Sequence, residues 1–351
     1  MTPSDNKTDQ TPGAPSGDAP ENRPKRRRKV FGLGFYALLV MLAAAAGGWL
    51  YTASILNRPA IFAADQTIII KPGAGRVVIS AVLNRAGINH PLWVMRLEEL
   101  RRGKSYIPKA GEFALPQGTS LMTAMDIIHQ GQSIQHQLTI PEGRSSAEVT
   151  AAINADDRLK GAITPQPAEG TLLPETYAFI RGASRNQLIQ RMQEAQEISF
   201  ASLWAGRAKD LPFETLEDAI ILASIVEKET GLSGERGKVA SVFINRLRAG
   251  MRLQSDPTVL YGLTQAGVEV ETLLRRHWKH NSPWNTYRVG GLPPTPICNP
   301  GEAAMAAVLN PDDTKYYYFV ANGKGGHNFA QSLAEHNRNV RLYQRLKKNQ
   351  N

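Results

Sequence analysis

The sequence predicts an α+β protein that follows a single N-terminal membrane helix. Three observations lead to this prediction: an uncharged apolar run near the start, repeated strand–turn–helix patterns after it, and a series of apolar helices in the second half. At 351 residues the chain has room for two folded domains. We expect a tail over 1–29, a transmembrane helix over 30–51, a small α/β domain over 65–136 and a larger α+β domain over 137–351.

The tail and the net charge limit the possible partners. Residues 1–23 consist mainly of Pro, Gly, Ser, Asp and Thr, a composition that cannot bury enough apolar surface to offset its ordering entropy, so we expect disorder. The formal net charge of +10 suits an anionic partner such as a membrane surface, an acidic polymer or nucleic acid. No nucleic-acid-binding motif is recognisable, and we therefore expect no nucleic-acid partner.

The apolar run Phe31–Tyr51 is long enough to cross a bilayer as one helix. Five cations over 25–29 precede it and none follows until Arg58, which predicts a cytoplasmic N-terminus and an external remainder. A cleaved signal peptide is the alternative, because Ala44–Ala46 offers small residues, but the length of the run favours an uncleaved anchor. Cys298 is the only cysteine, so no internal disulfide is possible.

Three short strands in the region after the anchor each lead through a Pro-containing turn into a helix. They begin near residues 67, 112 and 138, and Trp93–Arg102 adds an amphipathic helix between the first two. These units resemble LysM-type glycan-binding modules. The resemblance implies glycan binding by 65–136, and a spacer that lifts the next domain off the membrane is the open alternative.

The second half of the chain predicts helices separated by ordered loops. Leu292–Pro296 contains three prolines and must be an extended loop. The expected elements are a helix over 184–204, a mostly buried helix from Glu217 that Gly231 ends, a helix over 233–249, a helix that begins at Asp256-Pro257, a small-residue helix after Asn299–Gly301, a strand over 315–320 and a last helix from Ser332.

Glu227 is the first candidate functional residue. It lies on the same helical face as Ile220 and Ala223, and the negative end of the helix dipole disfavours its charge. The alternative is a frayed helix end at which Glu227 reaches solvent. Glu229 lies roughly 200° away around the helix, and we expect it to be solvated.

Several separated motifs resemble, in order, those of the MltG (YceG-like) endolytic murein transglycosylases. The resemblance covers roughly 137–343, and so many motifs in one order make chance agreement improbable. Trp284, His277 and Asn281 depart from the family pattern, which puts substrate contacts near them in doubt. The motifs are Glu169–Tyr177, Ile225–Thr230, Val242–Leu247, Met251–Val259, Asn285–Tyr287, Gly291–Pro294, Asn299–Gly301, Tyr318–Ala321 and Gly326–Phe329.

The resemblance implies a single-pass inner-membrane enzyme whose catalytic domain, 137–351, is periplasmic. The family cleaves peptidoglycan glycan strands without water, leaves 1,6-anhydromuramic ends and is expected to terminate nascent strands beside the peptidoglycan synthases. It needs no cofactor. Its catalytic glutamate is the first of the Ile-Val-Glu-Lys-Glu-Thr motif, which is Glu227 here.

The chemistry of glycan cleavage also favours a buried glutamate. The leaving oxygen needs a proton, and burial can raise the pKa of a glutamate from about 4.3 to about 6. A hydroxyl of the sugar itself as nucleophile makes a second carboxylate unnecessary. A muramidase-type hydrolase that uses Asp256, and a non-enzymatic peptidoglycan-binding scaffold, are the alternatives.

Further residues of the motifs are candidate substrate contacts. The amide and phenol side chains of Gln254, Asn285 and Tyr287 can hydrogen-bond to sugar hydroxyls, but they can equally brace loops. Asp256 can act in chemistry or simply be the N-cap before Pro257. The pair His277 and His280 lacks a third ligand, so we expect no metal. His327 can line a cleft or fasten a turn.

Overall fold

The computed structural model describes residues 25–270 and 272–350, so the predicted disorder of 1–23 lies outside the described residues. The chain divides into two compact units. The first comprises the described residues as far as Gln66, together with Ala74–Pro108 and Leu115–Gln130. The second comprises Thr67–Gly73, Lys109–Ala114 and the chain from Gly131 onward.

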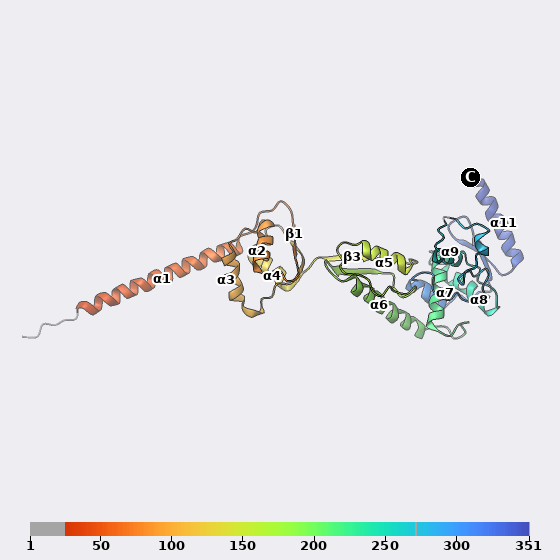
Figure 1. The fold of residues 1–351 in the computed structure, drawn as a ribbon, viewed down its shortest axis with the longest axis horizontal. Coiled ribbons are helices and arrows are strands. Elements are labelled where there is room, and N and C mark those ends of the chain that lie inside the picture. Colours follow the sequence, from red (N-terminus) through yellow and green to blue (C-terminus); the bar gives the residue numbers. More distant parts are fainter. Residues whose placement is uncertain (1–24, 271, 351) are drawn as a thin grey trace, which may run out of the picture. The chain divides into compact units, whose positions relative to one another are not determined.

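The first unit is helical (Figure 1). Its N-terminal helix contains a segment, Gly32–Asn57, that is long and apolar enough to cross a membrane, and the end of this helix contacts two others, α3 and α4. Buried apolar side chains such as Leu83, Val94 and Met125 form the interior of the unit. The elements are α1 (Lys25–Asn57), α2 (Arg76–Arg85), α3 (Leu92–Arg102), the short η1 (Gly103–Ser105) and α4 (Leu121–Gln130).

The second unit begins with two strand pairs. Strands β1 (Gln66–Ile70) and β2 (Gly111–Leu115) pair with each other, and β3 (Gln135–Thr139) pairs antiparallel with β4 (Thr176–Ile180). In the second pair Gln135 lies opposite Ile180 and Thr139 opposite Thr176.

Two helices cover one face of the β3–β4 pair (Figure 1). They are α5 (Ser146–Ala155) and α6 (Arg185–Ala205), and each begins after a serine, Ser145 or Ser184, whose hydroxyl accepts a backbone N–H of the first turn. Tyr177 from β4 packs into the core that these helices share with the strands.

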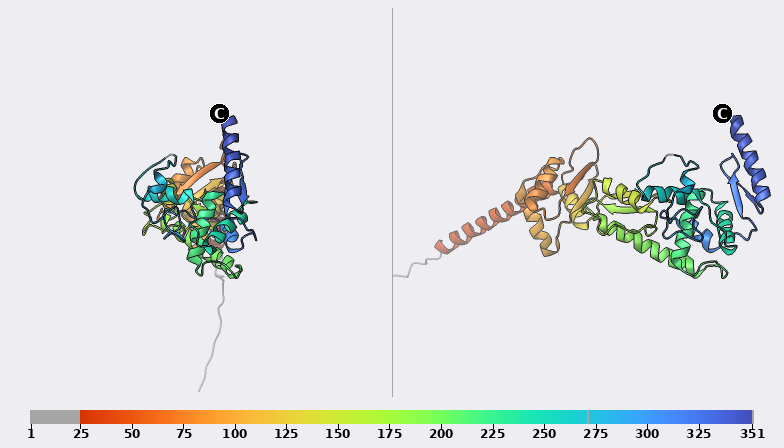
Figure 2. Two further views of the ribbon diagram at one scale, coloured as in Figure 1. Left: turned by 90° about the vertical axis from the view of Figure 1, so that its right-hand side faces the viewer. Right: turned by 45° about the vertical axis from the view of Figure 1, so that its right-hand side comes forward.

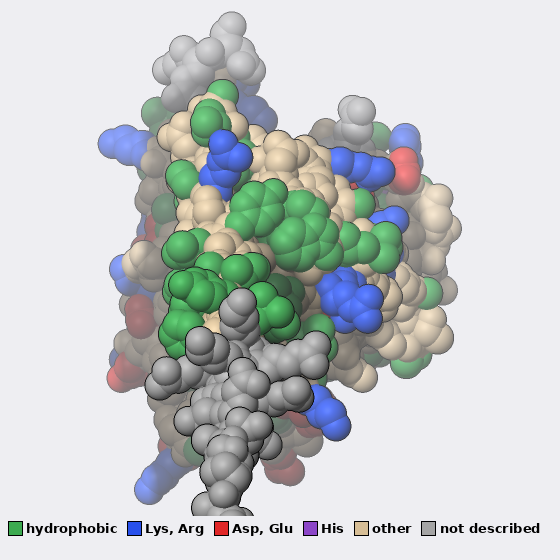
Figure 3. All heavy atoms as spheres, turned by 90° about the vertical axis from the view of Figure 1, so that its left-hand side faces the viewer, with side chains coloured by type: hydrophobic (Ala, Val, Ile, Leu, Met, Phe, Trp, Pro, Cys, Tyr) green, Lys and Arg blue, Asp and Glu red, His purple; other side chains and the backbone are tan. Residues whose placement is uncertain are grey.

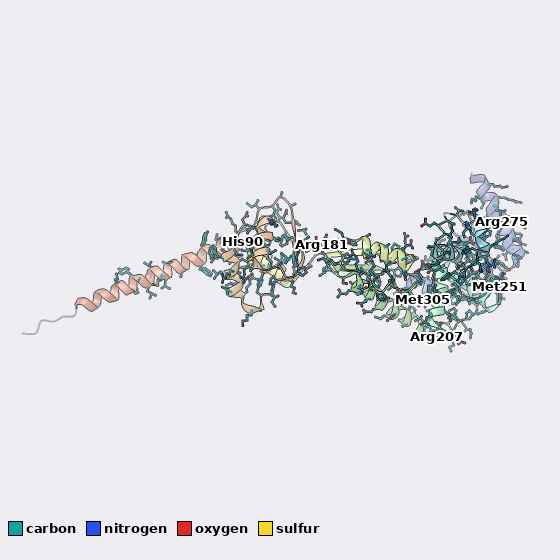
Figure 4. The ribbon with its side chains drawn as sticks, viewed as in Figure 1. His90, Arg181, Arg207, Met251, Arg275 and Met305 are labelled. Atoms are coloured by element: carbon teal, nitrogen blue, oxygen red, sulfur yellow. The ribbon has the colours of Figure 1, made fainter. Side chains whose placement is uncertain are left out.

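A helical core follows in the second unit. Leu222 and Val226 of α7, Phe243 of α8 and Met305 of α10 are fully buried in one cluster, and Figure 4 labels Met305 among the side chains of this part. The elements are α7 (Leu216–Glu229), α8 (Arg236–Arg248), α9 (Asp256–Gln265), the short η2 (His277–Lys279) and α10 (Glu302–Leu309).

The described chain ends with an antiparallel strand pair and a helix. Strands β5 (Tyr318–Ala321) and β6 (His327–Ala330) pair so that Ala321 lies opposite His327. Helix α11 (Leu333–Gln350) packs against both strands, as Figure 2 shows for the C-terminal part of the chain.

The predicted mixture of helices and strands is confirmed, with small shifts at element ends. Helix α8 begins at Arg236 rather than Ser233, and β5 begins at Tyr318 rather than Lys315. The expected N-cap role of Asp256 is wrong, because Ser255 is the N-cap and Asp256 is the first residue of α9. The LysM-type likeness of 65–136 stays a prediction.

Candidate active site

The candidate active site lies where α7 ends, at Glu229. Thr230, the C-cap residue, has an extended backbone (φ −149°), so the helix stops abruptly after this glutamate. The Oγ hydroxyl of Ser255 donates a 2.6 Å hydrogen bond to Glu229 Oε1. The prediction that Glu229 is solvated is therefore wrong, since its carboxyl group is enclosed between α7 and the start of α9.

Glu229 lines a cavity of about 400 Å³. Three of the five residues that the sequence singled out line the same cavity, namely Gln254, Asp256 and Tyr287. Aromatic side chains from β5 add an apolar wall, a combination of rings and polar groups that suits a sugar. Sequence reasoning missed several of the cavity-lining residues, among them Glu229, Arg246, Tyr318 and Phe319.

Burial raises the pKa of Glu229 to about 7. This value is the net result of several effects: the negative charge of Asp256 also raises the pKa, whereas the hydrogen bond from Ser255 and the positive charge of Arg246 lower it. A carboxyl group with a pKa near 7 is half protonated at neutral pH. Glu229 can therefore both give and accept a proton under the same conditions.

Asp256 is held by two aromatic residues on the rim of the cavity. Its Oδ1 accepts hydrogen bonds from the hydroxyl of Tyr287 at 2.7 Å and from Nε1 of Trp278 at 3.0 Å. The rings of these two residues stack with their centroids 5.7 Å apart. Two donors on one oxygen fix the position of the Asp256 carboxyl group on the rim of the cavity.

Gln254 has a backbone conformation that non-glycine residues rarely adopt, with φ of +49°. Its N–H donates to the carbonyl of Thr286 at 3.2 Å, which ties the segment before α9 to the 285–287 loop. Backbone strain of this kind is concentrated at functional sites. The strained backbone therefore supports a functional role for Gln254 in the cavity.

Asn285, in contrast, braces a loop. Its side chain is fully buried, and Nδ2 donates to the carbonyls of Trp278 and His280 at 3.0 and 2.8 Å. Of the two roles that the sequence left open for Asn285, the described contacts correspond to the bracing one. This amide holds the chain that carries Trp278 against the cavity rim.

Glu227 lies on the other side of α7 and is not among the residues that line the Glu229 cavity. Its side chain is only 5% exposed, which rules out the frayed, solvated end. Oε2 accepts the N–H of Gly301 at 3.0 Å, and Oε1 lies 3.7 Å from Nη2 of Arg236. Burial raises the pKa of Glu227, and the Glu142 carboxylate adds to this, whereas Gly301 and Arg236 oppose it.

The contacts of Glu227 join three helices. Gly301 is the N-cap of α10 and Arg236 is the first residue of α8, so this carboxylate links both helix starts to the end of α7. The helix N-terminus and the guanidinium oppose the rise in the pKa of Glu227 that burial causes, but they do not cancel it. The geometry of Glu227 is that of a connecting group.

His327 fastens a turn. Its Nδ1 lies 2.7 Å from Oε2 of Glu235, and its backbone N–H donates to Oε1 of the same carboxylate at 3.0 Å. This pair connects the start of β6 to the start of α8. Across residues 25–270 and 272–350, no group of three or more His, Cys, Asp or Glu side chains is arranged to hold a metal ion.

The comparisons with known proteins agree on one family. The model of the YceG-like family matches residues 68–342. A solved structure, of a YceG-like protein from Listeria monocytogenes, superposes with a TM-score of 0.50 at 28% sequence identity and covers 78% of this chain and 98% of that one.

Two curated relatives carry the name endolytic murein transglycosylase. The protein from Bacillus subtilis is 37% identical over 177 residues, which are 50% of this chain and 48% of the relative. The protein from Streptococcus pneumoniae strain D39 is 25% identical over 364 aligned positions, which cover 89% of this chain and 65% of the relative. The chain thus spans about half the length of the first relative.

Proposed function

Because the chain belongs to the YceG-like family, we propose that it is a lytic transglycosylase that cleaves the glycan strands of peptidoglycan. The names of the curated relatives support this activity. The observation that carries the proposal is Glu229, a carboxyl group with a pKa of about 7 in a cavity lined by aromatic and polar side chains.

Glu229 is the proton donor of the proposed reaction. In its protonated form it gives its proton to the glycosidic oxygen, so that the C1–O bond of the muramic residue breaks and the departing sugar leaves with a free 4-hydroxyl. Positive charge develops at C1 as this bond breaks. The Asp256 carboxylate, fixed by Tyr287 and Trp278, stabilises that charge electrostatically.

The same glutamate then acts as base. Ionised Glu229 takes the proton of the 6-hydroxyl of the muramic residue while that oxygen forms a bond to C1. Glu229 ends protonated, as it began, and no water is consumed. An attacking hydroxyl on the same sugar has the large effective concentration of a tethered nucleophile, so one acid/base group is sufficient.

This assignment replaces Glu227 by Glu229 as the catalytic acid. The two glutamates belong to the same motif, but Glu229 is the one that shares the cavity with Gln254, Asp256 and Tyr287. Glu227 instead binds Gly301 and lies beside Arg236, contacts that connect helices.

The masses of the product ends test the proposed reaction. Purified uncrosslinked glycan strands are digested with the full-length chain and the fragments are analysed by mass spectrometry. We expect 1,6-anhydromuramic ends, which are one water lighter than reducing ends. The second candidate is a muramidase-type hydrolase, because Asp256 lines the same cavity, and fragments with reducing ends alone would favour it. Intact strands would favour a non-enzymatic scaffold.

The apolar helix α1 supports a single-pass anchor with the catalytic domain outside the cytoplasm. The cations over 25–29 and the uncharged flank after Tyr51 favour a cytoplasmic N-terminus. A periplasmic-only reporter fused after Asn351 is expected to be active. Activity of a cytoplasm-only reporter at the same position would reverse the orientation and remove access to the wall.

Anchoring in the inner membrane suits an enzyme that cuts strands while they are made. We therefore propose that cleavage terminates nascent strands near the peptidoglycan synthases, and that the LysM-like region over 65–136 holds the strand. Glycan strands from cells that lack the protein would then be longer than normal. Unchanged strand lengths would contradict a role in termination.

A further inference from the structure

Helix α3 in the first unit has an apolar face that the described protein leaves uncovered. Trp93, Leu97 and Leu100 follow one another at helical spacing, and they are 50, 49 and 70% exposed. The buried face of the same helix carries Val94 and Met95, so α3 is apolar on two sides. A soluble surface helix normally exposes polar residues on its outer face.

This face continues into a groove beside α1. The groove has a volume of about 510 Å³ and is lined mainly by apolar side chains, of which Trp49, Ala53 and Leu56 come from α1 and Val94, Leu97 and Leu100 from α3. The rings of Tyr51 and Trp93 stack across the two helices with centroids 6.4 Å apart. The uncovered face is therefore continuous with the last turns of the membrane helix.

Charged residues lie at the margin of this surface. Arg101, which lines the groove, has a side chain that is 65% exposed, and its guanidinium pairs with Glu98 on the same helix. Arg96 and Lys104 are also exposed. Figure 3, which looks at the molecule from the side of α1, shows hydrophobic side chains gathered on this face, with Lys and Arg side chains next to them.

We infer that α3 lies in the headgroup–acyl boundary of the membrane, with phospholipid acyl chains in the groove between α1 and α3. The inference rests on the proposed anchor. An amphipathic helix with Trp and Leu on one face and cations at its margin is typical of an interfacial helix. Aromatic side chains such as Tyr51 and Trp93 are enriched at that depth, and the arginines suit anionic phosphate headgroups.

The consequence is a second attachment of the first unit to the bilayer. A single helix leaves the unit free to tilt about its exit point, whereas α3 in the interface restricts that tilt. The first unit then lies close to the membrane surface, and its tilt relative to that surface is restricted.

Spin labels at three single positions test this inference in the full-length chain. The native Cys298 is buried, and the unsubstituted chain measures its background labelling. Leu100→Cys reports on α3, Val40→Cys on the middle of α1, and Ile198→Cys on α6 as the matched exposed control. The chain is reconstituted in vesicles of phosphatidylethanolamine and phosphatidylglycerol, and collision rates with oxygen and with a water-soluble nickel chelate are measured.

We expect the ratio of oxygen to nickel accessibility at residue 100 to lie between the values at residues 40 and 198, and several-fold above the value at residue 198. A ratio at residue 100 equal to that at residue 198, with residue 40 inside the bilayer, would overturn the inference and leave the anchor intact. A water-accessible residue 40 would instead overturn the anchor. Exclusion of both reagents from residue 100 would mean that protein covers the groove, which also contradicts a lipid occupant.

Discussion

The Oγ hydroxyl of Ser255 lies 2.6 Å from Oε1 of Glu229 and donates a hydrogen bond to it. This bond joins the end of α7 to the start of α9 across 26 residues of sequence. Ser255 is itself held by the hydroxyl of Thr286, which accepts its backbone N–H at 3.0 Å. The orientation of the proposed acid is thus set by a chain of hydroxyl groups behind the cavity.

Replacement of Ser255 by alanine is expected to shift the pH dependence of turnover. The hydrogen bond stabilises the ionised form of Glu229, so its loss raises the pKa of this carboxyl group above its present value of about 7. The acid then stays protonated to higher pH, so the alkaline limb of the kcat/KM profile shifts to higher pH. Helix α9 should be little affected, because the Ser255 side chain makes no capping hydrogen bond. Ser255→Thr keeps the hydroxyl and should keep the original profile.

Asp256→Asn is expected to shift the same limb in the opposite direction. Removal of the negative charge lowers the pKa of Glu229, because the Asp256 carboxylate disfavours ionisation of its neighbour. The asparagine oxygen can still accept from Tyr287 and Trp278, so the site keeps its geometry. Turnover should fall because the charge that stabilises C1 is lost, but by less than in Glu229→Gln. pH–rate profiles of both variants check this pair. Shifts in the same direction, or complete loss in Asp256→Asn, would contradict the assigned roles.

The raised pKa of Glu229 also makes a prediction for stability. The folded pKa of about 7 exceeds the ordinary value of 4.5. Protonation therefore contributes stability that is fully present below about pH 4.5 and is lost as the pH rises through about 7. At pH 8.5 the ionised carboxylate costs up to about 3 kcal/mol, since one pKa unit corresponds to about 1.4 kcal/mol.

Glu229→Gln should accordingly raise the free energy of unfolding at pH 8.5 and change it little at pH 4. Denaturant unfolding in detergent at both pH values measures the difference. Glu217→Gln on the exposed first turn of α7 is the control and should show no such pH dependence. Equal effects of Glu229→Gln at the two pH values would show that its carboxyl group is not destabilised by burial.

The sequence predicted the local elements of this fold well. The apolar spacing from Glu217 predicted α7, and the helix expected over 184–204 agrees with α6 to within a residue at each end. These features succeed because they depend on neighbours in the chain.

The candidate site was harder to predict because it is non-local. Both glutamates of the motif lie on one short helix, and only the packing of the segments around 254–256 and 285–287 decides which of them faces a cavity. The apolar helical pattern suggested that Glu227 is more buried than Glu229. In the structure, however, the carboxylate of Glu227 accepts the N–H of Gly301 and lies beside Arg236. The positive φ of Gln254 was equally invisible, since no glycine marks it.

The most direct test of the account compares Glu229→Gln with Glu227→Gln on purified uncrosslinked glycan strands. Glutamine keeps the size and polarity of either side chain but cannot deliver a proton, and at position 227 it can still accept the N–H of Gly301. We predict a loss of turnover of about 100-fold or more in Glu229→Gln and a much smaller loss in Glu227→Gln. Near-normal turnover in Glu229→Gln, with Glu227→Gln folded but inactive, would contradict the assignment of Glu229 as the catalytic acid.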